Sequence, residues 1–113
     1  MFPTSQRQGA LAAVAVGLSA CGVAVASSDD GKKRAYGQHL ARECTSCHRI
    51  DGTDNGIPSI TGWPAADFVT TMNYYRDKQR PNPAMQSVAQ SLVEEDIEAL
   101  SLYFGSLPKP PHR

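Results

Sequence analysis

The sequence predicts a small all-α domain. Apolar side chains recur at spacings of three and four residues, as on one face of a helix, and the chain offers little of the alternation typical of strands. Segments rich in Gly, Pro, Asp and Asn separate these periodic stretches. The 113 residues carry 11 cations and 11 anions, and they contain neither an internal repeat nor a second domain. This neutral balance gives no indication of a nucleic-acid-binding surface.

The first two expected helices flank a polar loop. Residues 33–43 contain good helix formers, with apolar residues such as Tyr36 on one side and charges on the other. Residues 49–63 are rich in Gly, Asp, Asn and Thr, which indicates a loop. Pro64 is suited to the first position of the next helix. The apolar stripe of this second helix comprises Phe68, Met72 and Tyr75.

Two further helices are expected near the C-terminus. Pro81 and Pro83 stop the second helix, because proline cannot continue the helical hydrogen bonds. A short helix is expected around residues 86–90, and the last helix over residues 93–104. The stripe of the last helix comprises Ile97, Leu100, Tyr103 and Phe104. The Pro-rich residues 108–113 predict a disordered or extended tail.

Residues 1–26 are typical of an export signal. One cation precedes an Ala- and Val-rich run that is too short and too rich in Ala and Gly for a membrane span. Small residues at its end favour cleavage after Ala26, which leaves residues 27–107 as the domain. The segment "LSAC" offers an alternative, a lipoprotein signal of residues 1–20 with Cys21 lipidated. The apolar run continues past Cys21, which favours the soluble product. Both versions predict an exported, periplasmic bacterial protein.

A compact motif, "CTSCH", carries the chemistry of this chain. Outside the cytosol Cys44 and Cys47 could form a redox disulfide, but thioredoxin-like enzymes need a βαβ context. A zinc site would need two further ligands, and His39 and His112 lack the matching spacing. Cys-x-x-Cys-His is the attachment signature of haem c, with thioethers from both cysteines and His48 as an iron ligand. We therefore expect one covalently bound haem c.

The length of the chain supports the same conclusion. A mature chain of fewer than 90 residues buries a small core and is only marginally stable alone. A covalently held, largely apolar porphyrin would complete that core.

If His48 binds one side of the iron, the opposite side either takes a second protein ligand or stays open. Met72 belongs to a helical stripe, where methionine is more often a packing residue. His39 lies on the helix that enters the motif and should face away, and His112 lies in the tail. Met85 follows two prolines, on a segment expected to be irregular that can reach the opposite haem face. Because Met/His ligation is usual for electron-transfer haems, the sequence favours Met85.

These motifs resemble the class I, monohaem cytochromes c over nearly the whole mature length. "CTSCH" matches the haem motif, "IPSITG" a Pro-containing loop, and "NPAMQSVAQSLVEEDIEALSLYFGSL" the Met-ligand segment and closing helix. The resemblance implies a small cytochrome c fold of three to four helices wrapped round the haem. Its first and last helices would cross near Gly37 and Tyr103 or Phe104. It also implies that the carbonyl of Pro58 accepts a hydrogen bond from Nδ1 of His48.

A closer resemblance lies in the stretch "FVTTMNYYRDKQRPNPAM". It is similar to bacterial periplasmic cytochromes and to the haem subunit of flavocytochrome c sulfide dehydrogenase. Arg80, five residues before Met85, is a candidate partner for a haem propionate, because a guanidinium pairs well with a carboxylate. Two positions depart from the family pattern. Lys78 stands where relatives often have Gly, and Val93 stands where they favour a capping Ser or Thr.

The expected function is electron transfer rather than catalysis. Two protein ligands leave no place on the iron for a substrate, so transfer of single electrons remains. Two versions stay open: a freely diffusing periplasmic carrier, and a haem subunit of a dehydrogenase with a flavoprotein partner. A haem enzyme or gas sensor with an open iron is a third class to exclude. Redox proteins are the expected donor and acceptor, and the membrane is a partner only if Cys21 is lipidated.

Overall fold

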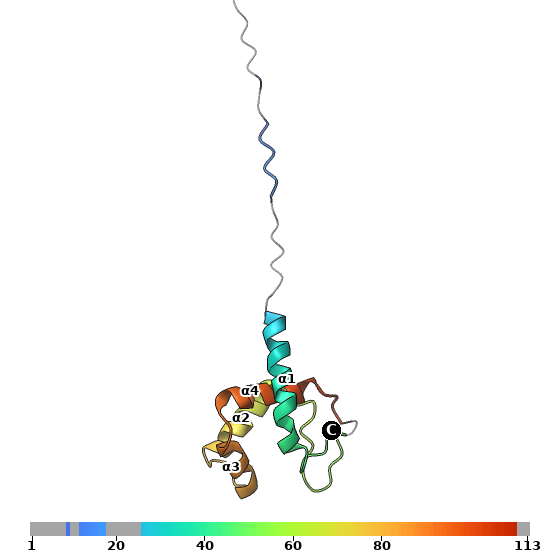
Figure 1. The fold of residues 1–113 in the computed structure, drawn as a ribbon, viewed down its shortest axis with the longest axis vertical. Helices are drawn as coiled ribbons and strands as arrows, with labels where there is room; N and C mark the ends of the chain where they lie inside the picture. The colour runs from blue at the N-terminus through green and yellow to red at the C-terminus, as the bar shows by residue number, and fades with distance from the viewer. Residues whose placement is uncertain (1–8, 10–11, 18–25, 111–113) are drawn as a thin grey trace, which may run out of the picture.

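A computed structural model describes residues 9, 12–17 and 26–110. Within these residues the chain forms helices and no strands, so the predicted all-α class is confirmed (Figure 1). The helices are α1 (Ala26–Cys44), α2 (Ala65–Arg76), α3 (Pro83–Gln90) and α4 (Glu94–Ser106). None of them is long and apolar enough to pass through a membrane. Most of the expected signal, with Cys21, lies outside the described residues, and so does His112.

The first helix is longer than the sequence indicated. α1 begins at Ala26 rather than at Lys33. Asp29 lies in its first turn, where a carboxylate interacts favourably with the positive end of the helix dipole. The helix ends at Cys44, so the "CTSCH" motif starts on its last residue. No loop therefore separates α1 from the motif.

α1 and α4 cross at a glycine. A Cβ atom on Gly37 would overlap the main-chain carbonyl of Ala99, so the two backbones touch. The expected crossing near Gly37 is therefore correct for α1. On α4 the contact lies at Ala99, one turn before Tyr103. The absence of a side chain at Gly37 is what lets the helices approach this closely.

Two polar contacts bind the same crossing. Lys33 Nζ lies 3.3 Å from Glu98 Oε2, and the hydroxyl of Tyr36 donates to Asp96 Oδ1 over 2.8 Å. The sequence placed Tyr36 among the apolar residues of this helix. The residue is 47 % exposed, and the hydrogen bond to Asp96 raises the pKa of Tyr36. Tyr36 therefore ties α1 to α4 through its hydroxyl group.

The hydrophobic core lies between α2, α4 and the inner side of α1. The expected stripes are confirmed for Phe68 and Met72 in α2, whereas Tyr75 is only half-buried. The rings of Phe68 and Phe104 stack with centroids 5.8 Å apart. The buried core residues are Ala41, Phe68, Met72, Ala89, Ile97, Leu100 and Phe104. This core supports the ends of α1 and α3, where the candidate ligands lie.

Both positions that depart from the family pattern lie at helix ends. Val93 is the N-cap of α4, but its side chain has no oxygen to accept a hydrogen bond from the first turn. Only the reverse bond is made, from the Val93 N–H to Asp96 Oδ2 over 3.1 Å. Lys78 follows α2 with a positive φ of 57°. The next residue, Gln79, donates its N–H to the carbonyl of Tyr74 over 2.8 Å, which closes the helix end.

Candidate functional site

The "CTSCH" motif forms one more turn at the end of α1. The N–H groups of Cys47 and His48 both point to the carbonyl of Cys44, over 3.2 and 2.9 Å. The N–H of Thr45 donates to the carbonyl of Ala41 over 2.9 Å and continues the helical pattern. The two thiols and the imidazole are therefore held by consecutive backbone hydrogen bonds.

The two thiols differ in their surroundings. Cys44 is half-buried against the core, whereas Cys47 is exposed, and neither is in a disulfide. Burial raises the pKa of Cys44 to about 11, with a smaller contribution from the neighbouring Glu43 carboxylate. Cys44 is therefore a neutral thiol at neutral pH. Over residues 9, 12–17 and 26–110, no group of three or more His, Cys, Asp or Glu side chains is placed to hold a metal ion.

His48 is oriented by one short hydrogen bond. Its Nδ1 lies 2.7 Å from the carbonyl oxygen of Pro58. Since a carbonyl can only accept, Nδ1 must carry the ring proton. In the neutral imidazole with this tautomer, Nε2 keeps a free lone pair, and this is the form that binds a metal.

The loop that presents Pro58 is pinned beside that residue by buried hydroxyl groups. Ser59 and Thr61 are 1 and 2 % exposed, and their hydroxyl oxygens lie 3.0 Å apart. The N–H of Gly62 donates to the carbonyl of Phe104 at the end of α4 over 2.8 Å. The sequence alone did not predict a role for these two hydroxyl residues. The signal was present in the Ser-x-Thr spacing directly after Pro58.

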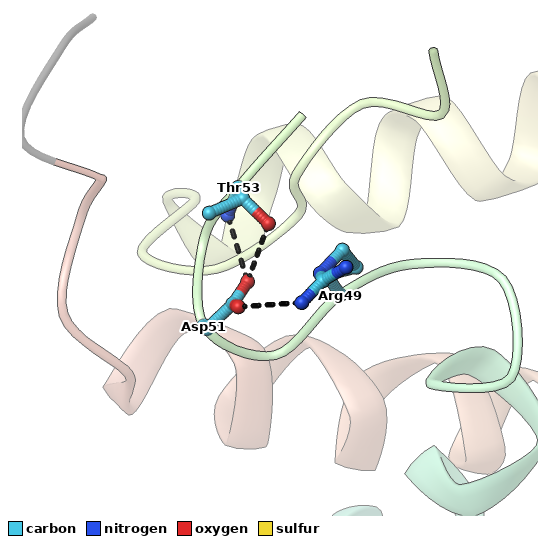
Figure 2. A network of polar contacts seen from close by, with 3 residues as sticks. All are labelled: Arg49, Asp51 and Thr53. Atoms are coloured by element: carbon cyan, nitrogen blue, oxygen red, sulfur yellow. Dashed lines mark hydrogen bonds and ion pairs between the residues drawn. The ribbon is translucent and has the colours of Figure 1, made fainter. Parts of the chain in front are cut away.

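The start of the same loop is held by a carboxylate (Figure 2). Asp51 Oδ1 accepts from the N–H and the hydroxyl of Thr53, over 3.0 and 2.7 Å. The guanidinium of Arg49 reaches the other carboxylate oxygen over 3.1 Å. The bonds from Thr53, backbone first, and then the bond from Arg49 lower the pKa of Asp51 to about 2. The chain directly after His48 is thus ordered by charge-assisted bonds.

Met85 lies in the first turn of α3 and not on an irregular segment. Its N–H donates to the side-chain oxygen of Asn82, the N-cap, over 3.0 Å. Pro83 cannot continue α2, but proline is well suited to begin a helix. The expectation that Met85 lies on an irregular segment was therefore wrong. The Met85 side chain is half-buried against the same core as Cys44. In Figure 1, α3 and the C-terminal end of α1 lie toward the same end of the molecule.

The competing ligand candidates are placed differently. Met72 is 6 % exposed and belongs to the core. His39 is exposed and lines a surface pocket of about 410 Å³ beside Ile50 and Tyr103, which includes neither Met85 nor Met72. His112 lies outside the described residues.

Arg80 is an exposed side chain between α2 and α3. Its guanidinium carbon lies 5.2 Å from the centroid of the Tyr75 ring, a cation–π distance. Its main-chain carbonyl accepts from the side-chain amide of Gln86 over 2.9 Å. The backbone of Arg80 is therefore tied to the residue that follows Met85.

The residues present fit a covalently held haem. They supply two free thiols on one turn, an imidazole with a free Nε2 and a half-buried thioether, which is the donor set of such a site. Among the described residues, the amide oxygen of Asn73 is buried without a hydrogen-bond partner.

Comparison with known proteins decides the family. No family model matches the chain. It is 31 % identical over 77 residues to the cytochrome subunit of sulfide dehydrogenase of Chlorobaculum tepidum, covering 67 % of this chain and 70 % of the relative. It is 34 % identical over 77 residues to cytochrome c-554(548) of Halomonas halodenitrificans, covering 64 % of this chain and 93 % of the relative. The chain belongs to the class I cytochromes c.

A third relative comes from another redox system. The thiosulfate dehydrogenase electron acceptor of Stutzerimonas stutzeri is 28 % identical over 91 residues, which cover 75 % of this chain and 42 % of that protein. The relatives are electron-transfer cytochromes or cytochrome subunits. The protein is accordingly an electron-transfer protein, and its family implies haem c as the cofactor and redox proteins as partners.

Proposed function

We propose that the protein is a periplasmic one-electron carrier. In this proposal one haem c is held through Cys44 and Cys47, with His48 and Met85 as the axial ligands. The observation that carries the proposal is the 2.7 Å contact between His48 Nδ1 and the Pro58 carbonyl. It supports axial ligation because it places the ring proton on Nδ1 and leaves Nε2 free for iron.

Each residue has a distinct task in this proposal. The two cysteines hold the cofactor permanently, so that it cannot be lost after export. When bound, the haem supplies a one-electron Fe(III)/Fe(II) couple. The hydrogen bond from His48 to Pro58 makes the imidazole a stronger donor, and the neutral thioether of Met85 favours the ferrous state. Arg80 would pair with a haem propionate.

Two methionine variants test the ligand assignment. Met85→Ala should remove one axial ligand of the haem iron. It should therefore abolish the weak far-red band of the ferric form, lower the midpoint potential and allow the ferrous form to bind carbon monoxide. Met72→Ala is the matched control. It removes a buried core side chain, which costs about 2–5 kcal/mol, and it should keep the native ligation. The proposal fails if Met72→Ala opens the iron and Met85→Ala does not.

Mass spectrometry of the exported protein tests attachment and processing together. The expected mass is the chain from Ser27 to Arg113 with one haem. A lipidated chain beginning at Cys21 would establish the lipoprotein alternative.

Replacing both Cys44 and Cys47 with Ala should leave little folded protein, because the core loses its tethered cofactor. Haem staining of a denaturing gel measures the loss of covalent haem, and far-UV circular dichroism measures the loss of helical structure.

A dehydrogenase subunit is the second candidate function. It is favoured by the 31 % identity to a cytochrome subunit of sulfide dehydrogenase. In that case the protein would receive electrons from a flavoprotein to which it is stably bound. Purification from the native periplasm separates the two versions: a stoichiometric complex with a flavoprotein supports the subunit, and a monomer supports the free carrier.

A further inference from the structure

The chain beyond α4 crosses the loop that presents Pro58. α4 ends at Ser106, and residues 107–110 continue without helix. In Figure 1 this segment descends beside the loop that follows α1. We refer to residues 107–110 as the strap. Its first residue, Leu107, packs against the hydrophobic core and anchors it.

The strap touches the loop at two glycines. A Cβ built on Gly62 would lie 2.8 Å from both the N and the Cα of Lys109, so Lys109 runs directly over Gly62. A Cβ on Gly52 would lie 3.2 Å from Cγ of Pro110. Both glycines have a positive φ, 70° at Gly62 and 80° at Gly52, which favours glycine there. The tail was expected to be disordered or extended; as far as Pro110 it forms no helix and touches the loop at these two glycines.

These two contacts lie on either side of Pro58 in the chain, and the carbonyl of Pro58 holds His48 Nδ1. Gly52 follows His48 closely, Gly62 follows Pro58 closely, and the backbone between the two glycines is not helical. Ser59 and Thr61, which are buried, connect Pro58 to Gly62. A shift of the loop at Gly62 would therefore move the Pro58 carbonyl.

We infer that the strap is a positioning element for the axial histidine. By holding Gly52 and Gly62, it fixes the distance from the Pro58 carbonyl to His48 Nδ1, and through it the donor strength of the imidazole. The inference rests on the proposed function, in which His48 binds the iron. Without the strap the hydrogen bond should lengthen, the imidazole should become a weaker donor, and the ferric state should lose stabilisation. The midpoint potential should then rise.

Two truncations of the holoprotein test the strap. The first removes residues 108–113, which deletes both contacts and keeps Leu107. The control removes residues 111–113 only. The readouts are the midpoint potential and the exchange rate of the His48 Nδ1 proton, measured by NMR in the ferrous protein. Only the longer truncation should raise the potential and accelerate exchange. Equal values in the two truncated proteins would overturn the inference.

A pair of double-mutant cycles separates a specific contact from a general loss of stability. Gly62→Ala should perturb the potential and the exchange rate in the full chain, and by much less in the chain lacking residues 108–113, since Lys109 is then absent. Gly56→Ala is the control, because Gly56 has a φ of 93° but nothing within 4 Å of a built Cβ. Its effect should be the same in both backgrounds. Additive behaviour of Gly62→Ala would contradict the strap.

The same samples keep the two proposals apart. The absorption spectrum of the full-length protein reports whether haem is bound with His and Met ligands, and this decides the proposed function. The inference about the strap is tested only by differences in midpoint potential and exchange rate between variants that keep the absorption spectrum of the full-length protein.

Discussion

Gly37 in α1 rests directly on the main-chain carbonyl of Ala99 in α4. An added Cβ would overlap that oxygen and would lie 3.1 Å from the nitrogen of Leu100. The neighbours are backbone atoms of a helix, which cannot swing aside as a side chain could. The contact therefore sets the closest distance at which α1 and α4 can cross.

Gly37→Ala should destabilise the protein despite its better helix propensity. The propensity gain is about 1 kcal/mol, whereas forced separation of packed helices costs about 1–3 kcal/mol. Gly31→Ala is the matched control in the same helix, because Gly31 has open space where its Cβ would go. It should stabilise by about 0.5–1 kcal/mol. Denaturant unfolding of both holoproteins measures the difference, and a stabilised Gly37→Ala protein would contradict the contact.

Lys78→Gly should stabilise the protein. Lys78 has a φ of 57°, in the left-handed region, at the position after α2 where glycine is usual. The left-handed conformation costs a non-glycine residue about 1–2 kcal/mol, and the extra freedom of glycine in the unfolded chain offsets about 0.5–1 kcal/mol of that. A net gain of about 0.5–1 kcal/mol is expected in the same unfolding assay.

Asp77→Gly provides the comparison for Lys78. Asp77 has an ordinary φ of −85°, so glycine brings no relief of strain there and should destabilise. Equal effects at positions 77 and 78 would show that the left-handed conformation costs nothing here.

The sequence predicted those features of the fold that depend on local periodicity. The stripes of α2 and α4 were correct at Phe68, Met72 and Phe104, because helical spacing of apolar residues directly reflects one buried side. The start of α3 could also have been predicted. Asn82 followed by Pro83 is a helix-start signal, although a proline considered alone indicates only that α2 has ended.

Features that join distant segments could not be predicted from the residues alone. Nothing in the local pattern selects Ala99 as the partner of Gly37, or pairs Tyr36 with Asp96. The contact of Lys109 with Gly62 is of the same kind, since both are ordinary loop residues until the chain is folded. For the candidate site, the motif around His48 was recognised from sequence spacing, but its anchoring through Ser59 and Thr61 was not.

The carboxyl group of Asp51 should titrate near pH 2. Its pKa is lowered to about 2, first by the bonds from Thr53 and then by Arg49. A carboxylate with a lowered pKa stabilises the folded state above its unfolded pKa of about 3.9, and this contribution is lost as the pH falls from there through about 2. NMR titration of the side chain measures the pKa directly. Thr53→Val removes one of the donors and should raise it.

Asp51→Asn is the control for the stability effect. It cannot titrate, so the difference in stability between this variant and the native protein should shrink as the pH is lowered from about 4 to 2. A constant difference across that window would show that the network in Figure 2 does not depend on the charge of Asp51.

Arg80→Leu should lower the midpoint potential while the haem stays bound with native ligands. Removing a cation disfavours the less positive, ferrous state, and losing a partner of a propionate acts in the same direction. Because Arg80 is exposed, the pair should contribute at most about 1 kcal/mol, or about 40 mV for one electron. Redox titration at low salt measures the drop, which should shrink at high salt as the charge is screened.

Arg80→Lys distinguishes charge from ring stacking. Lysine keeps the positive charge but loses the planar contact of the guanidinium, 5.2 Å from the Tyr75 ring centroid. If the charge sets the potential, Arg80→Lys should stay near the native value and only Arg80→Leu should fall. If both variants keep the native potential at low salt, the role of Arg80 is confined to its contact with Tyr75 and to the backbone bond from Gln86.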